Sequence, residues 1–502
     1  MTVGIPGILL VLDGWGHADE SEANALAAAS TPYLDRLLAT CPTVLADASG
    51  SAVGLLPGTV GNSEIGHMVI GAGRPIPYDS LLVHEEISSG RMGSNETLTD
   101  VLTQLSETGG TLHLIGLCSD GMIHADVRHL RELLRIAARF AVPQVHIHAV
   151  TDGRDVADGT AAVYLDLVDT FVSEAGIGQV VTVVGRGYAL DKSGRRDLTE
   201  KVALAVVDGK GEMIGEPRDA LALTDRGDEW VPPCVVIGAG GAPPGGVRDG
   251  DAVLFTNFRS DRIQQLADDL YQRLSGRPVA FLSLAQYDTQ APVPPLVHRS
   301  DASGGLAAEL ASHGVRSVRV SEAEKFEHVT YYINGRDATV VPVEEYVKVT
   351  GDTTPDYTTR PAMNIDRVAE AVVTAAGRDD VSLVIANLAN IDVVGHTGDF
   401  DATRLAAEHT DRAVEAICRT AQSAGRWVLL VGDHGNAEKM LTETGKPYGG
   451  HTTNPVPAVL VPVPGQQVAT SPESATLADI APSVLGLLGI APASRMTGRR
   501  LW

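Results

Sequence analysis

The sequence predicts an α/β protein built from two or three domains. At 502 residues the chain is too long for one ordinary hydrophobic core, and 44% apolar content with 53 Gly and 27 Pro is typical of a turn-rich globular protein. Short, continuous apolar runs recur along the chain, and amphipathic stretches such as residues 127 to 140 lie between them. This alternation is typical of sheets covered by helices.

The first apolar run, residues 7 to 12, predicts a buried parallel strand that ends at Asp13. Ligands of open α/β sheets bind at the carboxyl edge of the strands, so we expect Asp13 to face a crevice. Residues 22 to 39 predict a helix with Pro32 near the start of its second part, and residues 50 to 61 predict a loop.

The segment from Gly61 to His67, Gly-Asn-Ser-Glu-Ile-Gly-His, predicts a turn that caps a helix. The hydroxyl of Ser63 would then lie beside free backbone N–H groups, where a phosphoryl group is stabilised. The alternative is an ordinary serine cap with Glu64 in the first helical turn.

A second series of apolar runs predicts a separate α/β domain in the middle of the chain. Its strands are residues 112 to 117, 144 to 150, 180 to 184, 252 to 255 and 279 to 284. Each run ends in polar, mostly charged residues. The side chains that we expect to converge at this edge are His124, Asp152, Arg154, Asp155, Arg186, Arg259 and Arg262.

Four arginines at one edge of so acidic a protein indicate recognition of phosphate or carboxylate, because a guanidinium offers paired donors that match both groups. For a single arginine the alternative is a solvated surface residue. For Arg259 and Arg262 it is an ion pair with Asp261 at the start of a helix, and His124 alone could be a hydrogen-bonded loop residue.

The turn-rich residues 291 to 295 predict a second domain boundary, after which the sheet pattern returns. A strand over residues 315 to 320 leads to Ser321, which has the spacing of a helix cap with Glu324. Lys325 in that first turn would oppose the helix dipole, which hints that its ammonium acts elsewhere; a solvated lysine is the alternative. Further predicted strands are residues 382 to 385, 427 to 431 and 458 to 463.

Metal-binding residue types follow these last strands. Asp392 and His396 are four residues apart and would share one face of a helix, Asp433 and His434 follow the next strand, and His451 precedes the last one. Carboxylate and imidazole ligands without thiolates suit Mn²⁺, Zn²⁺, Co²⁺ or Mg²⁺, and two adjacent ions would bridge substrate oxygens and a nucleophile. Each residue alone could be a capping or turn residue.

Charge and cysteine content narrow the classes of function. A formal net charge of −24 speaks against general binding to nucleic acid or anionic membranes. The four cysteines are far apart and lack metal-site spacing, which favours a reducing cytoplasm. No apolar run approaches the ~20 residues of a membrane span, and the N-terminus lacks the pattern of an export signal.

Ten motifs, in order along nearly the whole chain, closely resemble the cofactor-independent (2,3-bisphosphoglycerate-independent) phosphoglycerate mutases. They are Leu-Asp-Gly-Trp-Gly (12 to 16), Gly-Asn-Ser-Glu-Ile-Gly-His (61 to 67), Ile-Gly-Ala-Gly-Arg (70 to 74), Ser-Asp-Gly (119 to 121), Asp-Gly-Arg-Asp-Val (152 to 156), Asn-Phe-Arg-Ser-Asp-Arg (257 to 262), Glu-Lys-Phe-Glu-His-Val-Thr (324 to 330), Asp-Val-Val-Gly-His (392 to 396), Asp-His-Gly-Asn (433 to 436) and His-Thr-Thr-Asn-Pro-Val-Pro (451 to 457).

The resemblance implies an alkaline-phosphatase-like sheet domain formed by residues 1–74 and 296–502, with a phosphotransferase domain, residues 75–295, inserted; residues 71 to 77 and 291 to 298 would be hinges. It implies a two-metal site, with Mn²⁺ as the first expectation. One ion would be held by Asp392, His396 and His451, and the other by Asp13, Ser63, Asp433 and His434. The implied substrate-binding residues are His124, Arg154, Asp155, Arg186, Lys192, Arg259, Arg262 and Lys325.

The implied reaction is the interconversion of 3- and 2-phosphoglycerate through a phosphoserine on Ser63, with catalytic roles for Asp155, Lys325 and Arg259. The expected protein is a cytoplasmic monomer that acts on a small phosphorylated acid. The sequence departs from the family pattern at Gly187, Lys192 and Gly432, and Arg195 or Arg196 could replace Lys192 in its role. The alternatives are a related metal-dependent mutase or phosphatase for another phosphorylated acid or sugar, and a non-catalytic metal-binding scaffold.

Overall fold

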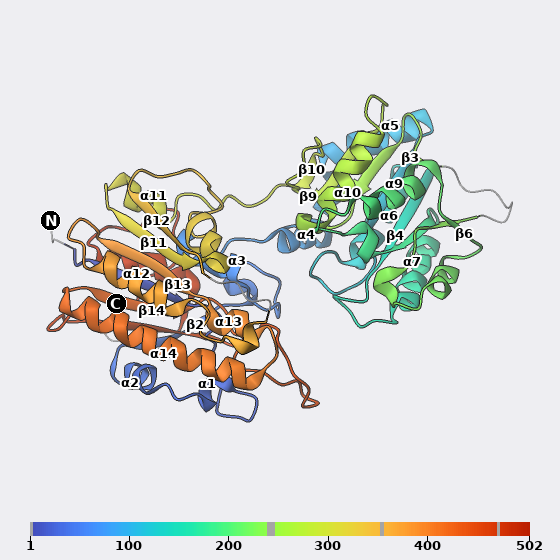
Figure 1. The fold of residues 1–502 in the computed structure, drawn as a ribbon. Helices are drawn as coiled ribbons and strands as arrows, with labels where there is room; N and C mark the ends of the chain where they lie inside the picture. Colours follow the sequence, from blue (N-terminus) through green and yellow to red (C-terminus); the bar gives the residue numbers. More distant parts are fainter. Residues whose placement is uncertain (1–3, 238–245, 352–355, 469–471) are drawn as a thin grey trace. The chain divides into compact units, whose positions relative to one another are not determined.

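The structure, a computed structural model, describes residues 4–237, 246–351, 356–468 and 472–502 and confirms the predicted α/β class. The chain divides into two compact units: unit 1 comprises Met1–Pro77 and Ser300–Trp502, and unit 2 comprises Tyr78–Arg299. Each unit has its own eight-stranded sheet covered by helices (Figure 1).

The sheet of unit 1 has the strand order β12-β11-β13-β1-β14-β15-β2-β16. All its neighbouring strands are parallel except at β15, which runs antiparallel to both β14 and β2. The strands are β1 (Gly7–Leu12), β2 (Thr43–Asp47), β11 (Ser317–Glu322), β12 (Glu344–Val349), β13 (Leu383–Leu388), β14 (Trp427–Gly432), β15 (Val456–Val461) and β16 (Ala475–Thr476).

The central strands of unit 1 are buried on both faces because helices cover both sides of the sheet. This burial explains why the sequences of these strands are continuously apolar. One core joins alternate residues of β1, including Ile8 and Leu10, to α2, α12 and α14. The helices are α1 (Ala25–Ala28), α2 (Pro32–Thr40), α3 (Ser63–Ala72), α11 (Leu306–Ser312), α12 (Ile365–Ala376), α13 (Asn390–Gly395), α14 (Phe400–Ser423) and α15 (Ile480–Leu487), with shorter turns η1 (Gly50–Ala52), η5 (Ala323–Lys325), η6 (His328–Tyr332), η7 (Tyr357–Thr359) and η8 (Leu477–Asp479).

Two local predictions in unit 1 need correction. The helix predicted over residues 22 to 39 is two helices, because the Asn24 side chain caps α1 and Pro32 starts α2 afresh. The cap predicted at Ser321 is wrong: β11 continues to Glu322, and the helical segment that follows, η5 and then η6, has no side-chain cap. Parallel pairing with β12 extends through Glu322, and this pairing overrides the local capping signal.

The sheet of unit 2 has the order β10-β9-β8-β3-β4-β5-β7-β6 and is parallel except between β5 and β7. Its strands are β3 (Thr111–Leu117), β4 (Gln144–Thr151), β5 (Gln179–Gly185), β6 (Glu212–Ile214), β7 (Cys234–Val236), β8 (Ala252–Phe255), β9 (Ala280–Ala285) and β10 (Pro295–Val297). Its helices are α4 (Asp79–Ser88), α5 (Glu96–Thr108), α6 (Val127–Arg139), α7 (Ala161–Ala175), α8 (Arg186–Ala189), α9 (Arg196–Asp208) and α10 (Ser260–Arg273), with turns η2 (Arg91–Ser94), η3 (Pro217–Leu223) and η4 (Asp228–Trp230).

A chain of buried polar side chains crosses the sheet of unit 2. His113 contacts Asp251 at 3.2 Å and His148 at 3.0 Å, and His148 contacts the hydroxyl of Thr182 at 2.9 Å. His146 packs edge-on against His113. Burial lowers the pKa of His146 to about 4 and the pKa of His148 well below its ordinary value, and the nearby His113 lowers both further. These two rings are therefore neutral in the folded protein.

Unit 2 should lose stability in mild acid. Histidines in the unfolded chain take up protons below about pH 6.5 while the folded His146 stays neutral, so its stabilisation is present above pH 6.5 and is lost as the pH falls toward 4. Between pH 7 and pH 5 the free energy of unfolding of the wild type should fall by about 2 kcal/mol more than that of His146→Gln, measured by urea unfolding. The exposed His313→Gln should behave as the wild type, and equal pH dependence in all three proteins would contradict this reading.

Candidate active site

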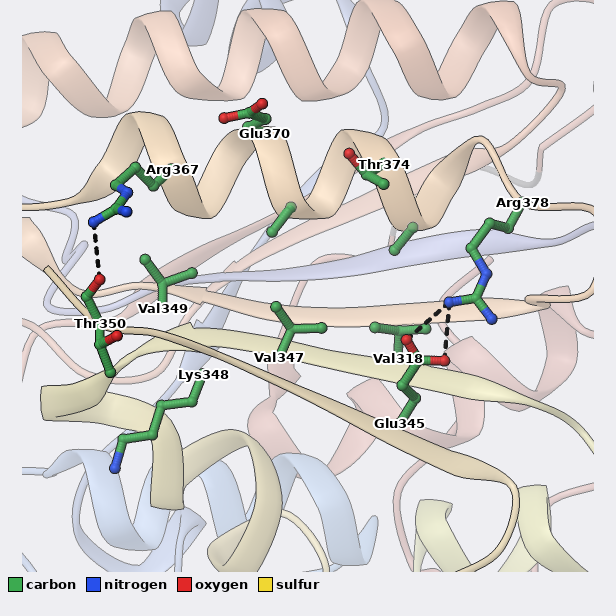
Figure 2. Close-up of a pocket in the computed structure, with 12 residues that line it drawn as sticks. Val318, Glu345, Val347, Lys348, Val349, Thr350, Arg367, Glu370, Thr374 and Arg378 are labelled. Atoms are coloured by element: carbon green, nitrogen blue, oxygen red, sulfur yellow. Dashed lines mark hydrogen bonds and ion pairs between the residues drawn. The ribbon is translucent and has the colours of Figure 1, made fainter.

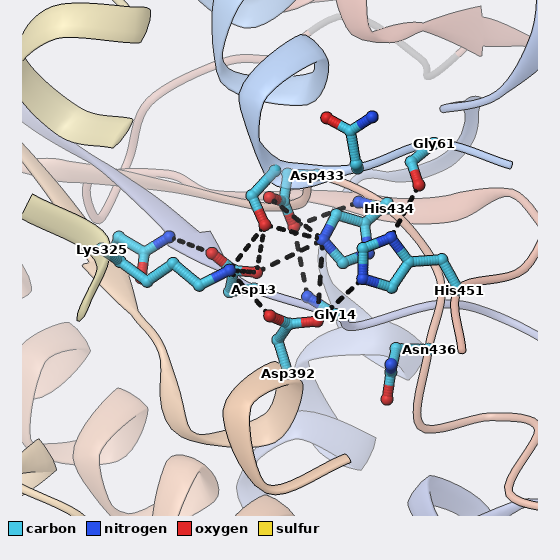
Figure 3. Close-up of polar contacts among 12 residues, drawn as sticks. Asp13, Gly14, Gly61, Lys325, Asp392, Asp433, His434, Asn436 and His451 are labelled. Carbon is cyan, nitrogen blue, oxygen red and sulfur yellow. Dashed lines mark hydrogen bonds and ion pairs between the residues drawn. The ribbon is translucent and has the colours of Figure 1, made fainter. Parts of the chain in front are cut away.

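Strand register brings the acidic residues of unit 1 together. Leu12 at the end of β1 pairs with Leu388 of β13 on one side and with Gly432 of β14 on the other. Asp13 and Asp433, the next residues of β1 and β14, therefore lie at the same edge, and α13 places Asp392 beside them (Figure 3). All three carboxylates are buried. Buried carboxylates need cations or hydrogen-bond donors to balance them.

Ser63 is the first residue of α3, and its hydroxyl points into this group of carboxylates. The cap of α3 is Asn62, whose side chain accepts a hydrogen bond from the backbone N–H of Ile65, so the alternative of Ser63 as an ordinary cap is wrong. The Oγ atom of Ser63 lies 3.1 Å from Asp13 Oδ1 and 3.0 Å from His434 Nε2. A glycine at position 66 allows this approach, because a Cβ there would lie 2.6 Å from the Asp433 carbonyl.

Lys325 is a buried cation at the centre of the site. Its Nζ donates to Ser63 Oγ at 2.6 Å, to Asp392 Oδ2 at 2.7 Å and to Asp13 Oδ1 at 2.9 Å. Burial alone would lower the pKa of Lys325, but the carboxylates of Asp13 and Asp392 outweigh it and raise the pKa well above its ordinary value. The ammonium is therefore charged and cannot act as a base near neutral pH.

His434 is a second cation of the site. Burial would lower its pKa, but the negative charge of Asp433 and the contacts with Asp13 and Asp392 raise the pKa of His434 to about 10. Asp13 in turn keeps a pKa well below its ordinary value despite its burial, because Lys325 and His434 stabilise the carboxylate.

A second group of side chains surrounds the other side of Asp392. Nε2 of His396 and Nε2 of His451 lie 3.5 and 3.4 Å from Asp392 Oδ1. Each ring contacts a backbone carbonyl through Nδ1, His396 with Gly449 and His451 with Gly61, both at 2.8 Å. If Nδ1 carries the proton in these contacts, both Nε2 lone pairs are directed toward Asp392, which is the tautomer that metal-binding histidines use.

These side chains fit divalent cations. Three overlapping groups have ligand atoms within 4.8 Å of one another: Asp392 with His396 and His451, Asp13 with Asp392 and His434, and Asp13 with His67 and Asp433. Asp392 Oδ1 accepts no hydrogen bond within the described part of the chain. Carboxylate and imidazole donors around such an oxygen suit a dication, and sulfur ligands are absent from these groups.

Two residues that sequence reasoning missed orient the acidic ligands. Asn387 in β13 donates to Asp13 Oδ2 at 2.6 Å and lies 3.1 Å from Nε2 of His67. His67 contacts the carbonyl of Ser63 at 2.9 Å and Asp433 Oδ2 at 3.2 Å through Nδ1. An asparagine within the apolar run of β13, and a histidine one helical turn after Ser63, were the signals available in the sequence.

In unit 2, four of the predicted residues form a buried ion network at the carboxyl ends of β3, β4 and β5. Arg186 contacts Asp152 at 2.6 Å and Asp155 at 2.7 Å, and His124 Nδ1 lies 3.2 Å from Asp155 Oδ2. Burial would raise the pKa of Asp155, but His124 and Arg186 outweigh it and lower the pKa. Asp155 is therefore ionised, and Arg186 is already paired with two carboxylates.

The other predicted arginines lie close enough to affect one another. Burial and the positive charges of Arg154, Arg186 and Arg259 lower the pKa of Arg262. Arg154 also contacts Glu229, and Arg259 contacts Asp261 at 2.9 Å, so the alternative of a helix-start ion pair holds for Arg259. Such like charges favour an anionic ligand, which would relieve their repulsion.

The substrate-binding role assigned to Lys192 has three candidates, and all three side chains are exposed in the segment between α8 and the start of α9. Lys192 lies in the connecting loop, Arg195 pairs with Asp197 at 3.6 Å, and Arg196 pairs with Asp269 at 3.1 Å. Gly187 is closely packed: a Cβ at this position would lie 2.8 Å from the Glu229 carbonyl oxygen and 2.9 Å from the ring of Trp230, so a larger residue would require these neighbours to shift.

A cavity of about 440 Å³ lies elsewhere in unit 1, between β12 and α12, and contains none of the predicted site residues (Figure 2). Its two arginines are engaged, Arg367 with the carbonyl of Thr350 and Arg378 with Glu345. Among its described residues, this cavity therefore has neither an unpaired arginine nor any of the predicted site residues that a phosphoryl-transfer site would need.

Comparisons with known proteins agree with this chemistry. Residues 6–492 match the metalloenzyme superfamily. The chain is 60% identical, over 99% of its length and 98% of the relative, to a protein of Streptomyces coelicolor named 2,3-bisphosphoglycerate-independent phosphoglycerate mutase. A Synechococcus protein of the same name is 38% identical over 99% of this chain and 95% of its own. A crystal structure of Leishmania mexicana phosphoglycerate mutase at low cobalt concentration has a TM-score of 0.77 and 27% identity, covering 99% of this chain and 98% of that one.

Lys325→Met should destabilise the metal-free protein. The substitution removes the cation that lies between Asp13 and Asp392 and leaves buried carboxylates uncompensated, so we expect a loss of about 3–5 kcal/mol in the free energy of unfolding. Urea unfolding after treatment with EDTA measures this loss, and excess Mn²⁺ should restore part of it. The exposed Lys210→Met is the matched control, and equal stability of the two metal-free variants would refute the central role of Lys325.

Proposed function

The chain belongs to the family of 2,3-bisphosphoglycerate-independent phosphoglycerate mutases, and we propose that it interconverts 3- and 2-phosphoglycerate by passing the phosphoryl group through Ser63. The observation that carries this proposal is the contact of one buried hydroxyl, that of Ser63, with Lys325, Asp13 and His434. As an isomerase of this family it depends on a divalent metal, which the carboxylate and imidazole groups of unit 1 suit.

We propose two ions, Mn²⁺ in the first place, with Mg²⁺, Co²⁺ and Zn²⁺ as alternatives. Asp392, His396 and His451 would hold one, and Asp13, Ser63, Asp433 and His434 the other. The first set has its ligand atoms within 4.8 Å of one another, and in the second set Ser63 Oγ lies 3.1 Å from Asp13 and 3.0 Å from His434. When bound, the ions would lower the pKa of the serine hydroxyl and withdraw charge from phosphoryl oxygens.

Ser63 is the proposed nucleophile that attacks phosphorus. The N-terminus of α3 and the ammonium of Lys325 supply positive charge where the phosphoryl oxygens would gather. The hydroxyl of Ser63 gives up its proton and Oγ forms a bond to phosphorus, while the bond from phosphorus to the glycerate oxygen breaks and that oxygen takes up a proton. The result is a phosphoserine and a glycerate that the enzyme holds.

The cationic residues of unit 2 are proposed to hold the glycerate carboxylate. Arg154, Arg259 and Arg262 offer guanidinium donors, and the ionised Asp155 can accept the proton of the glycerate hydroxyl that attacks the phosphoserine. Over the two transfers, one proton moves from the oxygen that gains the phosphoryl group to the oxygen that loses it, and the enzyme is restored. A role for His124, Arg186 and Lys192 in binding the substrate remains part of the same proposal.

We also propose a cytoplasmic monomer that does not bind nucleic acid or membranes. The net charge of −24 and the four free thiols support this proposal. No helix among the described residues is long and apolar enough to cross a bilayer.

Ser63→Ala should abolish the reaction. With Mn²⁺ and no added 2,3-bisphosphoglycerate, the wild type should convert 3-phosphoglycerate to 2-phosphoglycerate in an enolase-coupled assay, and the variant should lose roughly 10⁴-fold or more in kcat. Intact mass after rapid acid quench should show one added phosphoryl group in the wild type only. The exposed Ser51→Ala is the matched control, and a requirement for added bisphosphate, or a phosphorylated Ser63→Ala chain, would overturn the mechanism.

Binding of Mn²⁺ should strengthen with rising pH. His434, with a pKa of about 10 in the metal-free site, must lose its proton to coordinate a metal, so affinity should rise about tenfold per pH unit between pH 7 and 9. Its protonated form stabilises the metal-free fold below pH 6.5, and this stabilisation is lost as the pH rises through 10. Calorimetric titration at several pH values measures the slope, His434→Asn should flatten it, and a flat wild-type profile would exclude this coupling.

A further inference from the structure

A second set of metal-binding side chains lies in unit 2, apart from the groups of unit 1. His84 comes from α4, Asp126 caps α6, and His129 lies on the first turn of α6. One ligand atom from each lies within 4.8 Å of the other two, and His129 Nε2 is 3.9 Å from Asp126 Oδ2. The mechanism above uses none of these three residues.

His129 has no evident structural partner. Its side chain is 2% exposed, yet neither ring nitrogen has a hydrogen-bond partner among the residues that the structure describes. Its ring instead packs near the rings of His84 and Phe258, at 6.1 Å between centroids in both cases. A buried imidazole with two unsatisfied nitrogens is costly, because each has left water without a replacement. A ligand at this position would remove that cost.

The donor set specifies the class of ligand. Two imidazoles and one carboxylate suit Zn²⁺ and other late first-row dications, whereas Mg²⁺ and Ca²⁺ prefer oxygen alone. Ligand atoms around a tetrahedral ion with bonds of ~2.0–2.2 Å are separated by roughly 3.3–3.6 Å. The three atoms here lie within 4.8 Å of one another, so they would have to move closer together to hold an ion, and three protein ligands would leave a fourth position for water.

We propose that His84, Asp126 and His129 form a third metal site, selective for Zn²⁺ or a similar late transition-metal ion. The site joins α4, whose first residue directly follows Tyr78 at the start of unit 2, to the first turn of α6. The same turn follows the loop of His124, whose carbonyl accepts from the backbone N–H of Phe258. The ion would therefore fix the segment that carries His124 as well as α4.

Arg128 competes with such an ion for Asp126. Its guanidinium contacts Asp126 Oδ1 at 2.8 Å and Oδ2 at 2.8 and 3.0 Å. The Arg128 side chain is 60% exposed, so it can move into solvent when a dication takes its place. Removing this guanidinium should consequently strengthen metal binding, whereas a chance pair of histidines would be insensitive to it.

Equilibrium dialysis of the EDTA-treated full chain with Zn²⁺, followed by elemental analysis, tests the proposal. To separate it from the proposed function, the measurements use an Asp13→Asn, Asp392→Asn background, which weakens both ion sites proposed for unit 1. We expect this background to bind an ion that is lost in His129→Gln and in His84→Gln. Arg128→Ala should tighten binding several-fold, and the exposed His313→Gln should change nothing.

Zn²⁺ should also raise the melting temperature of the background protein, and His84→Gln, which alters a half-buried side chain, should abolish this shift while melting normally without metal. Co²⁺ in place of Zn²⁺ should give the visible absorption of a four-coordinate site. Equal Zn²⁺ binding with and without His84 and His129, or no gain from Arg128→Ala, would overturn the third site and leave the mutase mechanism untouched. Loss of Mn²⁺-dependent turnover in Ser63→Ala bears only on the latter.

Discussion

The electrostatic repulsion among Asp13, Asp392 and Asp433 is the constraint on which the rest of unit 1 depends. Three strands and one short helix bring these carboxylates into one buried volume, where they cannot remain without positive charge. In the structure described here Lys325 and His434 supply that charge. The same arrangement of carboxylates and imidazoles suits divalent cations.

The same constraint explains why Ser63 is chemically unusual. Asn62 takes the capping role at α3, so the serine hydroxyl is directed at the charged group instead of at its own helix. Its neighbours are an ammonium, a carboxylate and an imidazole, all buried. A hydroxyl in these surroundings faces charged side chains, whereas the hydroxyl of a serine cap accepts a hydrogen bond from a backbone N–H of its own helix.

Much of the site was predictable because parallel strands end at a common edge. Asp13, Asp392 and Asp433 were expected there from the apolar runs that precede them, and the structure places them together. His67 and Asn387 were not expected, because they contact each other across 320 residues of sequence and no local pattern indicates such a contact. The cap predicted at Ser321 fails for the opposite reason. The local capping pattern is present, but pairing with β12 keeps this residue in the strand. In unit 2 the clustering of arginines was foreseen, but the pairing of Arg186 with Asp152 and Asp155 was not.

The antiparallel direction of β15 has a consequence for how this chain can vary. Because β15 runs back alongside β14, the segment between them leaves and re-enters the sheet at one edge, so Asp433 and His434 stand at its beginning and His451 near its end. A bridge between Gly435 and Thr452 fastens the base of this excursion. Its outer portion, from about Leu441 to Pro447, can therefore tolerate insertions and substitutions without moving the residues at the two ends of the segment.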